Sequence, residues 1–171
     1  MAQPLAEFLD QARQRVDDAL ERWLPKAPAC PPIVGDAMRY SMFAGGKRLR
    51  PILALAAAQA VDASAAELAL PAACAIEMIH TYSLIHDDLP AMDNDTLRRG
   101  RPTLHVVAGE GMAILAGDGL LTEAFGLLAR EPVTSDPPII ARKLRVVRLI
   151  AEAAGSTGMV GGQAIDLQAA G

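Results

Sequence analysis

Residues 65–88, AAELALPAACAIEMIHTYSLIHDD, form a long and almost wholly apolar segment with helical character. Apolar residues surround the predicted helix on every side, so it lacks the polar face that a surface helix turns to water. We therefore expect this helix to form the centre of the fold, and Pro90 to end or distort it. Its few polar residues, among them Glu77, His80 and Asp87, are then expected to point inward to a cavity.

Helical geometry places several of these polar side chains on one face. At about 100° per residue, His80 lies within about 20° of Asp87, and Ser83 lies about 40° from it. Asp88 stands beside that face. Taken alone, His80 would be better explained as a hydrogen-bonded core histidine. For the acidic helix end, a solvated turn is the weaker alternative. The apolar surroundings favour the functional interpretation.

The end of this helix begins an acidic run, in which Asp87, Asp88, Asp93 and Asp95 fall within nine residues. Carboxylates so close together raise one another's pKa unless a cation or strong hydrogen-bond donors neutralise them. Clusters rich in oxygen and free of cysteine suit a hard cation, above all Mg²⁺. The following residues 98–101, Arg-Arg-Gly-Arg, can supply bidentate contacts to phosphate oxygens. The pattern predicts Mg²⁺ bridging carboxylates to a phosphorylated substrate.

An EF-hand is excluded, although Asp93-Asn94-Asp95 begins like one. Such a loop needs an oxygen ligand, a glycine and a glutamate at its fifth, sixth and twelfth positions. Those positions hold Leu97, Arg98 and Leu104.

A second group of candidate residues is Gly45-Gly46-Lys47-Arg48-Leu49-Arg50-Pro51, at the start of a predicted helix. Glycines before a helix let backbone amides approach an anion, and the helix dipole favours negative charge there. Lys47 and Arg50 can reach one ligand from the first turn. The segment is not a Walker loop, because Arg48 stands where serine or threonine is needed and the earlier glycine is missing. Alone, it would be explained as a solvated helix end.

Two further segments place polar residues in apolar helices. Residues 158–166, Gly-Met-Val-Gly-Gly-Gln-Ala-Ile-Asp, follow no strand, so a dinucleotide site is improbable, and close helix packing explains the glycines equally well. Gln163 and Asp166 would share one face of that helix. Asp118 also lies in an apolar helix, where a buried carboxylate needs a partner that the sequence does not identify.

The remaining sequence predicts an all-α protein of one domain. Of its residues, 51% are hydrophobic but only 4% are aromatic, which favours closely packed helices over a β-sandwich. No segment predicts a convincing strand, and residues 103–108 are ambiguous. The other predicted helices span residues 5–24, 33–44, 48–61, 111–130, 139–154 and 156–170.

Charge and targeting signals restrict the class of protein. A net charge of -4 gives no general attraction to nucleic acid or anionic membranes. Cys30 and Cys74 are far apart, which is typical of reduced, buried thiols. The N-terminus has no signal-peptide pattern, and we expect no stretch to reach the ~18 apolar residues of a membrane span. We therefore expect a soluble cytoplasmic protein.

Together these segments resemble the trans-prenyltransferases, or polyprenyl synthetases, and most closely the bacterial farnesyl diphosphate synthases (geranyltranstransferases). The resemblance runs in family order from about residue 35 to the end. It rests on residues 45–51, His80, 87–93, 98–100, 102–103, 116–118 and 162–167. It implies an isoprenoid-synthase-type helical bundle around a central apolar cavity, here incomplete.

The resemblance also implies the substrates and the residues that bind them. The residues that would hold the diphosphate of isopentenyl diphosphate are Lys47, Arg50, His80 and Arg99. Arg98 would hold the diphosphate of the allylic substrate, dimethylallyl or geranyl diphosphate. The implied reaction is a 1'-4 condensation of the two, after Mg²⁺-assisted ionisation of the allylic diphosphate.

The same resemblance implies a magnesium site. Asp87 and Asp93 would ligate Mg²⁺, with Asp88 in support. Gln163 would line the allylic pocket, and Asp166 would support water molecules on the metal. Asp87, Asp88, Asp93, Arg98 and Gln163 are thus the expected catalytic residues.

Product length depends in this family on the residues four and five positions before the first aspartate, here Ser83 and Tyr82. A bulky Tyr82 implies a short product, and farnesyl diphosphate is the expected one. Helical geometry supports only Ser83 on the face of Asp87. The spacing around Pro90 fits geranylgeranyl enzymes of the plant type equally well, so a geranyl or geranylgeranyl diphosphate synthase is the alternative.

The family also has a second aspartate-rich motif, which residues 1–171 do not contain. We therefore expect these residues to be the N-terminal part of a single prenyltransferase domain, to supply one wall of the cavity, and to be inactive alone. A non-catalytic, subunit-like partner of a complete enzyme is a further alternative. The resemblance implies a homodimer.

Overall fold

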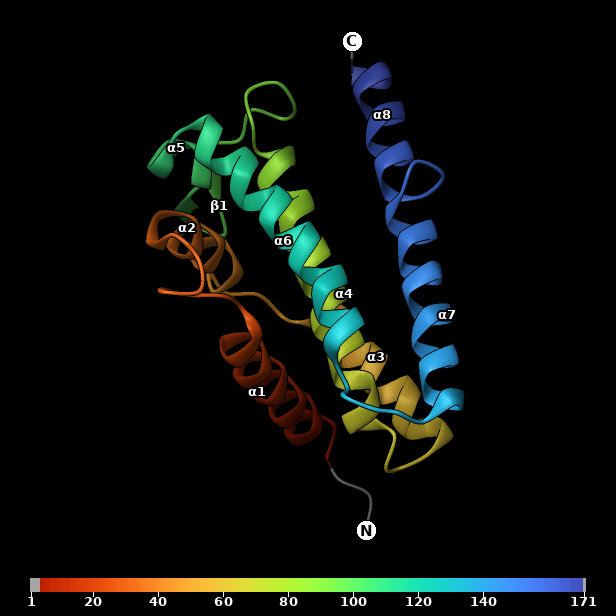
Figure 1. Ribbon diagram of the computed structural model, residues 1–171. Helices are drawn as coiled ribbons and strands as arrows, with labels where there is room; N and C mark the ends of the chain where they lie inside the picture. The colour runs from red at the N-terminus through yellow and green to blue at the C-terminus, as the bar shows by residue number, and fades with distance from the viewer. Residues whose placement is uncertain (1–3, 171) are drawn as a thin grey trace.

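The computed structural model describes residues 4–170, and helices make up most of this range (Figure 1). The helices are α1 (Leu5–Trp23), α2 (Pro32–Met42), α3 (Leu49–Val61), α4 (Ala66–Asp87), α5 (Leu104–Ala108), α6 (Glu110–Arg130), α7 (Pro137–Ala154) and α8 (Met159–Ala170). The prediction of an all-α fold is confirmed, with helix ends within a few residues of those expected.

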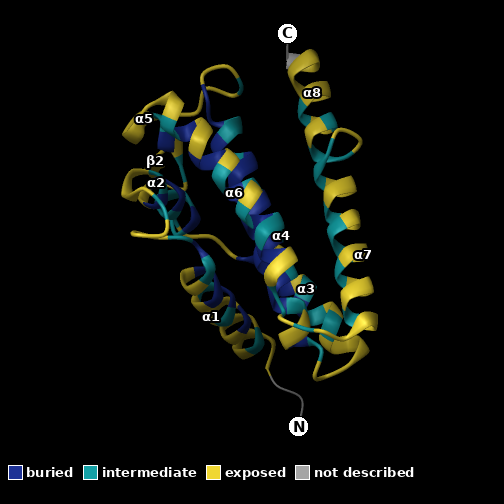
Figure 2. Ribbon diagram, viewed as in Figure 1, coloured by how far each residue is buried: buried dark blue, intermediate teal, exposed yellow. Residues whose placement is uncertain are grey.

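Helix α4 is the centre of the fold, as predicted. It packs along α6 and also contacts α1, α2, α3 and α7. Its buried residues lie on all sides of the helix, and those of α6 continue the same core (Figure 2). Alanines such as Ala73, Ala113 and Ala116 are fully buried at this contact, and their small side chains let the two helices approach closely. A core of alanine, leucine and methionine explains the low aromatic content.

The two sides of this central pair differ in burial. Helices α1 and α2 lie on one side, while α7 and α8 follow one another along the other (Figure 1). No residue of α7 is buried, and most of α7 and α8 is exposed or only partly covered (Figure 2). The exposed large apolar side chains on these two helices are Ile140, Leu144, Leu149, Val160, Ile165 and Leu167.

One prediction about strands was wrong. Two short strands, β1 (Leu97–Arg98) and β2 (Arg101–Pro102), pair antiparallel. The turn between them places Arg99 at φ 54° and Gly100 at φ 76°, and two successive positive φ values suit a tight hairpin. Strands of two residues are too short to show the alternation that reveals a strand in sequence.

The expectation that no apolar stretch is long enough to span a membrane was also wrong. Helices α4 and α6 are both long and apolar enough to cross a membrane, judged by length and composition alone. Their apolar side chains instead pack against each other, and 67% of the apolar window of α4 is buried. A core helix of a soluble protein passes the same test.

The two cysteines differ in their surroundings. Both are free; Cys74 is buried and Cys30 is partly exposed. Burial raises the pKa of the Cys74 thiol to about 12. Neither cysteine forms a disulfide bond in this structure, and burial holds only for Cys74.

The close contact of α4 with α6 generates a stability prediction at Gly117. A Cβ atom at this position would overlap the imidazole of His86. That ring is held in place, because its Nε2 atom lies 3.2 Å from the carbonyl oxygen of Ile114 and the ring packs edge-on against Tyr82. Gly117→Ala should therefore lower the free energy of unfolding by about 1–3 kcal/mol, as measured by urea denaturation.

The matched control lies in the same helix. A Cβ atom at Gly111 would meet no other atom within 4 Å, so Gly111→Ala should leave stability unchanged or raise it by up to about 1 kcal/mol. Equal effects of the two substitutions would contradict the importance of the His86 contact.

Candidate active site

The glycine-rich loop before α3 brings several of the predicted anion-binding residues together. Gly45 and Gly46 have φ values of 89° and 146°, which only glycine adopts readily. The Nη1 atom of Arg99 donates to the carbonyl oxygen of Gly45. Lys47 is exposed on the same loop. The hairpin residue Arg99 therefore contacts the loop that carries Lys47, although more than fifty residues separate the two in sequence.

Arg50 and His80 also meet, as predicted. The Nη1 atom of Arg50 lies 3.4 Å from Nε2 of His80, across the gap between α3 and α4. Burial lowers the pKa of the His80 imidazole, and the positive charge of Arg50 lowers it further. The neutral imidazole can then accept a hydrogen bond from the guanidinium.

The hairpin between β1 and β2 sends its neighbouring arginines to different places. Arg99 contacts the glycine loop, whereas the Nε and Nη2 atoms of Arg98 lie 2.7 and 2.6 Å from Oδ1 of Asp88. The Asp88 side chain is only 6% exposed. The hydrogen bond to Asp88 raises the pKa of Arg98. Asp88 is thus neutralised by Arg98 inside the protein, and it does not line the acidic cleft described next.

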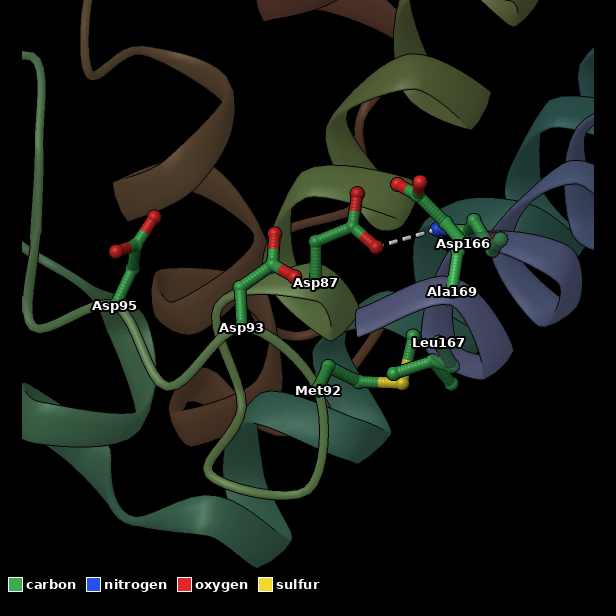
Figure 3. A pocket seen from close by; sticks show the side chains of 8 residues that line it. Asp87, Met92, Asp93, Asp95, Asp166, Leu167 and Ala169 are labelled. Carbon is green, nitrogen blue, oxygen red and sulfur yellow. Dashed lines mark hydrogen bonds between the residues drawn. The ribbon is translucent and has the colours of Figure 1, made fainter. Parts of the chain in front are cut away.

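A cleft of about 710 Å³ opens beside the end of α4 (Figure 3). The chain folds back after α4, and the backbone N–H of Asp93 donates to the carbonyl oxygen of Asp87 over 2.9 Å. The opposite wall is α8, from which Nε2 of Gln163 donates to Oδ1 of Asp87 over 2.6 Å. The residues lining the cleft are Asp87, Met92, Asp93, Asp95, Gln163, Asp166, Leu167 and Ala169.

The surroundings of Asp87 in this cleft disfavour the ionised form of its carboxyl group. Burial raises the pKa of its carboxyl group, and the nearby charge of Asp93 adds to the rise. The hydrogen bond from Gln163 and the charge of Arg98 oppose the shift without cancelling it. A cation bound in the cleft would relieve this excess of negative charge.

The donor set is compatible with Mg²⁺. Asp87 and Asp93 supply hard carboxylate oxygens into one open, polar space. Among residues 4–170, no three histidine, cysteine, aspartate or glutamate side chains are grouped closely enough to hold a metal ion by themselves. An ion bound by two carboxylates needs further oxygen ligands, and Mg²⁺ commonly takes these from water and from the phosphates of a substrate.

An apolar cavity of about 560 Å³ adjoins the acidic cleft. Its polar wall consists of Arg50, His80, Ser83, Asp87 and Gln163. The other lining residues are Ile76, Ile79, Leu84, Leu149, Ile150, Ala153, Ala154 and Met159. Asp87 and Gln163 line both spaces. The shared face of His80, Ser83 and Asp87 is therefore confirmed, and it borders an apolar chamber.

Two polar residues of the apolar helices, Glu77 and Asp118, differ from expectation, and the role of Tyr82 is not tested. Glu77 does not line the cavity; it forms a buried ion pair with Arg48 at 2.9 Å. Asp118 is 61% exposed, so the expectation of a buried carboxylate was wrong; its Oδ1 atom lies 3.9 Å from Nε2 of His86. Tyr82 is buried, with its ring edge-on to His86 at 5.5 Å. Its effect on product length stays a prediction.

The sequence interpretation missed two structural contacts of this region. One is the Arg48–Glu77 pair, and the other is the packing of His86 against Gly117. A glutamate in an all-apolar helix signals that a cation must reach it, but the pattern does not say which one. The glycine in α6 carries no signal of its neighbour.

Known proteins share this sequence and fold. The profile of the polyprenyl synthetase family, described as "Polyprenyl synthetase", matches residues 31–171. The chain belongs to this family. The farnesyl diphosphate synthase of Geobacillus stearothermophilus is 53% identical over 165 residues, which cover 96% of this chain and 54% of that protein. The geranylgeranyl diphosphate synthase of Cyanophora paradoxa is 47% identical over 167 residues, 98% of this chain and 54% of that protein.

The fold of this chain is also similar to that of solved structures of prenyl diphosphate synthases. An FPP/GFPP synthase from Zymomonas mobilis matches with a TM-score of 0.87 and 44% identity, over 96% of this chain and 58% of that one. The resemblance and the all-α fold of isoprenyl diphosphate synthases are therefore confirmed. The chain spans about half the length of the curated relatives it matches.

The raised pKa of Asp87 generates a prediction about stability and pH. A carboxyl group with a raised pKa in the folded state stabilises the protein below its unfolded pKa, and this contribution is lost as the pH rises through the folded value. Ionised Asp87 therefore lowers the stability of the metal-free protein at neutral pH. Asp87→Asn should raise the Tm at pH 7, and the difference should vanish below about pH 4.

Thermal denaturation followed by circular dichroism in EDTA-containing buffer measures this effect. The control is Asp95→Asn, which removes the same charge from an exposed side chain and should not raise the Tm. A lower Tm for Asp87→Asn at pH 7 would show that the ionised carboxylate stabilises the cleft.

Proposed function

We propose that this chain forms the metal-binding wall of a prenyltransferase that condenses isopentenyl diphosphate with an allylic diphosphate, dimethylallyl or geranyl diphosphate. The observation that carries the proposal is the cavity shared by the Arg50–His80 pair and Asp87, whose remaining walls are largely apolar. Cationic and anionic groups thus lie at the polar end of a chamber suited to a hydrocarbon chain.

Different residues are available to bind the diphosphate groups of the two substrates. Lys47, Arg50, His80 and Arg99 can hold the diphosphate of isopentenyl diphosphate, because the last three lie at or beside the glycine loop. The resemblance assigns the allylic diphosphate to Arg98. In the structure Arg98 pairs with Asp88, so a role toward substrate would involve the side of its guanidinium that faces away from that carboxylate.

Asp87 and Asp93 would hold Mg²⁺, with Asp88 acting through Arg98 and Asp166 facing the same cleft. When bound, the metal would neutralise the diphosphate of the allylic substrate as its C–O bond breaks. Gln163 orients the Asp87 carboxylate by its hydrogen bond. The apolar walls exclude water from the allylic cation until the double bond of isopentenyl diphosphate attacks it. The new 1'-4 bond forms, and a proton passes to the released diphosphate.

Farnesyl diphosphate is the product that we propose. Relatives named farnesyl diphosphate synthase, from Geobacillus stearothermophilus and Bacillus subtilis, are 53% and 47% identical to this chain. The alternative product is geranylgeranyl diphosphate, because a relative named for that activity is 47% identical. Ser83 lines the apolar cavity, where its side chain can affect the size of the cavity. Tyr82 is buried against His86 and does not line the cavity.

The proposal extends to the domain, its assembly and its location. We propose that residues 1–171 are the N-terminal part of a single all-α domain, in line with the greater length of the relatives. We also propose a cytoplasmic homodimer. The exposed apolar residues Val106, Val107, Ile114 and Leu115 on α5 and α6 support an interaction surface there, which light scattering can test.

An assay with isopentenyl and dimethylallyl diphosphates in the presence of Mg²⁺, followed by product chromatography, tests the reaction. Farnesyl diphosphate as product would support the first assignment, and a twenty-carbon product would support the alternative. A chain that is inactive alone but changes the product of a full-length prenyltransferase would instead act as a subunit-like partner.

A binding measurement tests the metal site independently of turnover. Asp87→Ala removes a proposed ligand and should weaken Mg²⁺-dependent binding of inorganic pyrophosphate roughly 100-fold or more, since even residues that only orient ligands contribute 10–100-fold. Isothermal titration calorimetry with and without EDTA measures this. Asp136→Asn, which removes the same charge from an exposed side chain outside the cleft, should bind as the unaltered chain does. Unchanged binding by Asp87→Ala would exclude the metal assignment.

A further inference from the structure

Arg48 is a buried cation that joins three helices. Its side chain is 4% exposed, and each of its three nitrogen atoms donates to a different segment. Nε donates to Oδ1 of Asp17 on α1 over 2.7 Å, and Nη1 to Oε1 of Glu77 on α4 over 2.9 Å. Nη2 donates over 2.7 Å to the carbonyl oxygen of Met42, the last residue of α2.

The backbone at Arg48 is also unusual. Its φ of 50° and ψ of 33° lie in the left-handed region, which costs free energy for any residue with a Cβ atom. This residue follows Lys47 directly and precedes the first residue of α3. The left-handed turn lets Arg48 point into the core while Lys47 and Arg50 remain exposed. Burial of one residue thereby sets the direction of its neighbours.

The partners of Arg48 connect it to the anion-binding residues. Glu77 lies on α4 three residues, about one turn, before His80. Fixing Arg48 against Glu77 therefore fixes the start of α3 relative to His80, which Arg50 must reach. The carbonyl oxygen of Gly45, in the same loop, receives Arg99. The buried cation is thus the common anchor of side chains from the loop, α3 and the hairpin.

Stability alone does not account for such a pair. A buried ion pair often stabilises a protein no more than apolar residues of the same volume would, because desolvation of the charges offsets their attraction. What a three-way guanidinium contact does supply is geometry, since its planar fork fixes the directions of all three acceptors. Arg48 therefore has the properties expected of a residue that sets position.

We propose that Arg48, through Asp17 and Glu77, is a positioning residue for the diphosphate-binding loop formed by residues 45–50. It does not touch substrate, because its nitrogens are buried and bonded to protein acceptors. The inference rests on the proposed function, in which Lys47, Arg50, His80 and Arg99 hold a diphosphate through their own charges and hydrogen bonds. It adds to that function a structural cause for their alignment.

Arg48→Lys tests the inference, because lysine keeps the charge but cannot reach three separate acceptors. Calorimetry with inorganic pyrophosphate in EDTA should show binding weakened about tenfold or more, since charge-assisted hydrogen bonds to the anion lose their alignment. The matched control is Arg39→Lys. Arg39 pairs with Glu21 on α1 but lies on α2, outside the loop, and its replacement should leave pyrophosphate binding within twofold.

A second pair of variants keeps the test decisive if Arg48→Lys fails to fold. Asp17→Asn removes the charge of the half-exposed partner, and Glu21→Gln makes the same change one turn further along α1. Asp17→Asn should weaken pyrophosphate binding, and Glu21→Gln should not. Amide hydrogen exchange should accelerate in residues 44–52 of Asp17→Asn and stay unchanged in α6. Faster exchange throughout the protein would indicate a general structural role and overturn the inference.

The outcomes separate this inference from the proposed function. Arg50→Ala serves as the reference for loss of the anion site. Metal-free pyrophosphate binding that is lost in Arg50→Ala but survives in both Arg48→Lys and Asp17→Asn would overturn the positioning role alone. Absence of metal-free binding in the unaltered chain would overturn the diphosphate site, and the positioning role with it.

Discussion

Because α4 is enclosed by other segments over most of its surface, most of the polar groups of its C-terminal half find their partners on other segments. This constraint organises the site. The resulting pairs are Glu77 with Arg48, His80 with Arg50, His86 with the carbonyl of Ile114, Asp87 with Gln163 and Asp88 with Arg98. The partners come from the loop before α3, from α3, α6, α8 and the hairpin. The hydrogen bonds and ion pairs of this one helix thus bring residues from several distant segments of the chain to the C-terminal half of α4.

The adjacent carboxylates Asp87 and Asp88 at the end of α4 have different surroundings. Successive residues of a helix point about 100° apart, so Asp88 turns into the core while Asp87 turns to the cleft. Arg98 neutralises the buried carboxylate completely. The half-buried Asp87 receives an amide hydrogen bond from Gln163, and burial together with the charge of Asp93 raises its pKa. Arg98 therefore pairs with two carboxylates of the acidic run, Asp88 and Asp95, and Asp87 and Asp93 are left for a cation from outside.

Local sequence patterns predicted the parts of this arrangement that depend on periodicity. The all-round apolar pattern identified α4 as the core, and helical spacing placed His80, Ser83 and Asp87 on one face. The missed features depend on tertiary contact. Nothing near Arg48 indicates that it reaches Asp17 and Glu77, and nothing near Asp118 indicates that the outer side of α6 is exposed there. The hairpin was not predicted, because strands of two residues are too short to show an alternating pattern in the sequence.

The two walls of the cleft are held with unequal strength, and this has consequences for the chemistry. The α4 wall is anchored by the core and by the Arg98–Asp88 pair, whereas α7 has no buried residue and contacts α6 and α4 only sparsely. Segments with few buried contacts open at low free-energy cost. The bond between Gln163 and Asp87 is therefore a principal tie between α8 and the core. The groups proposed to bind the metal and a diphosphate directly, namely Asp87, Asp93 and the Arg50–His80 pair, lie on the well-anchored side. The apolar residues that only need to exclude water lie largely on the other, so the cavity can change its volume without disturbing the charged groups.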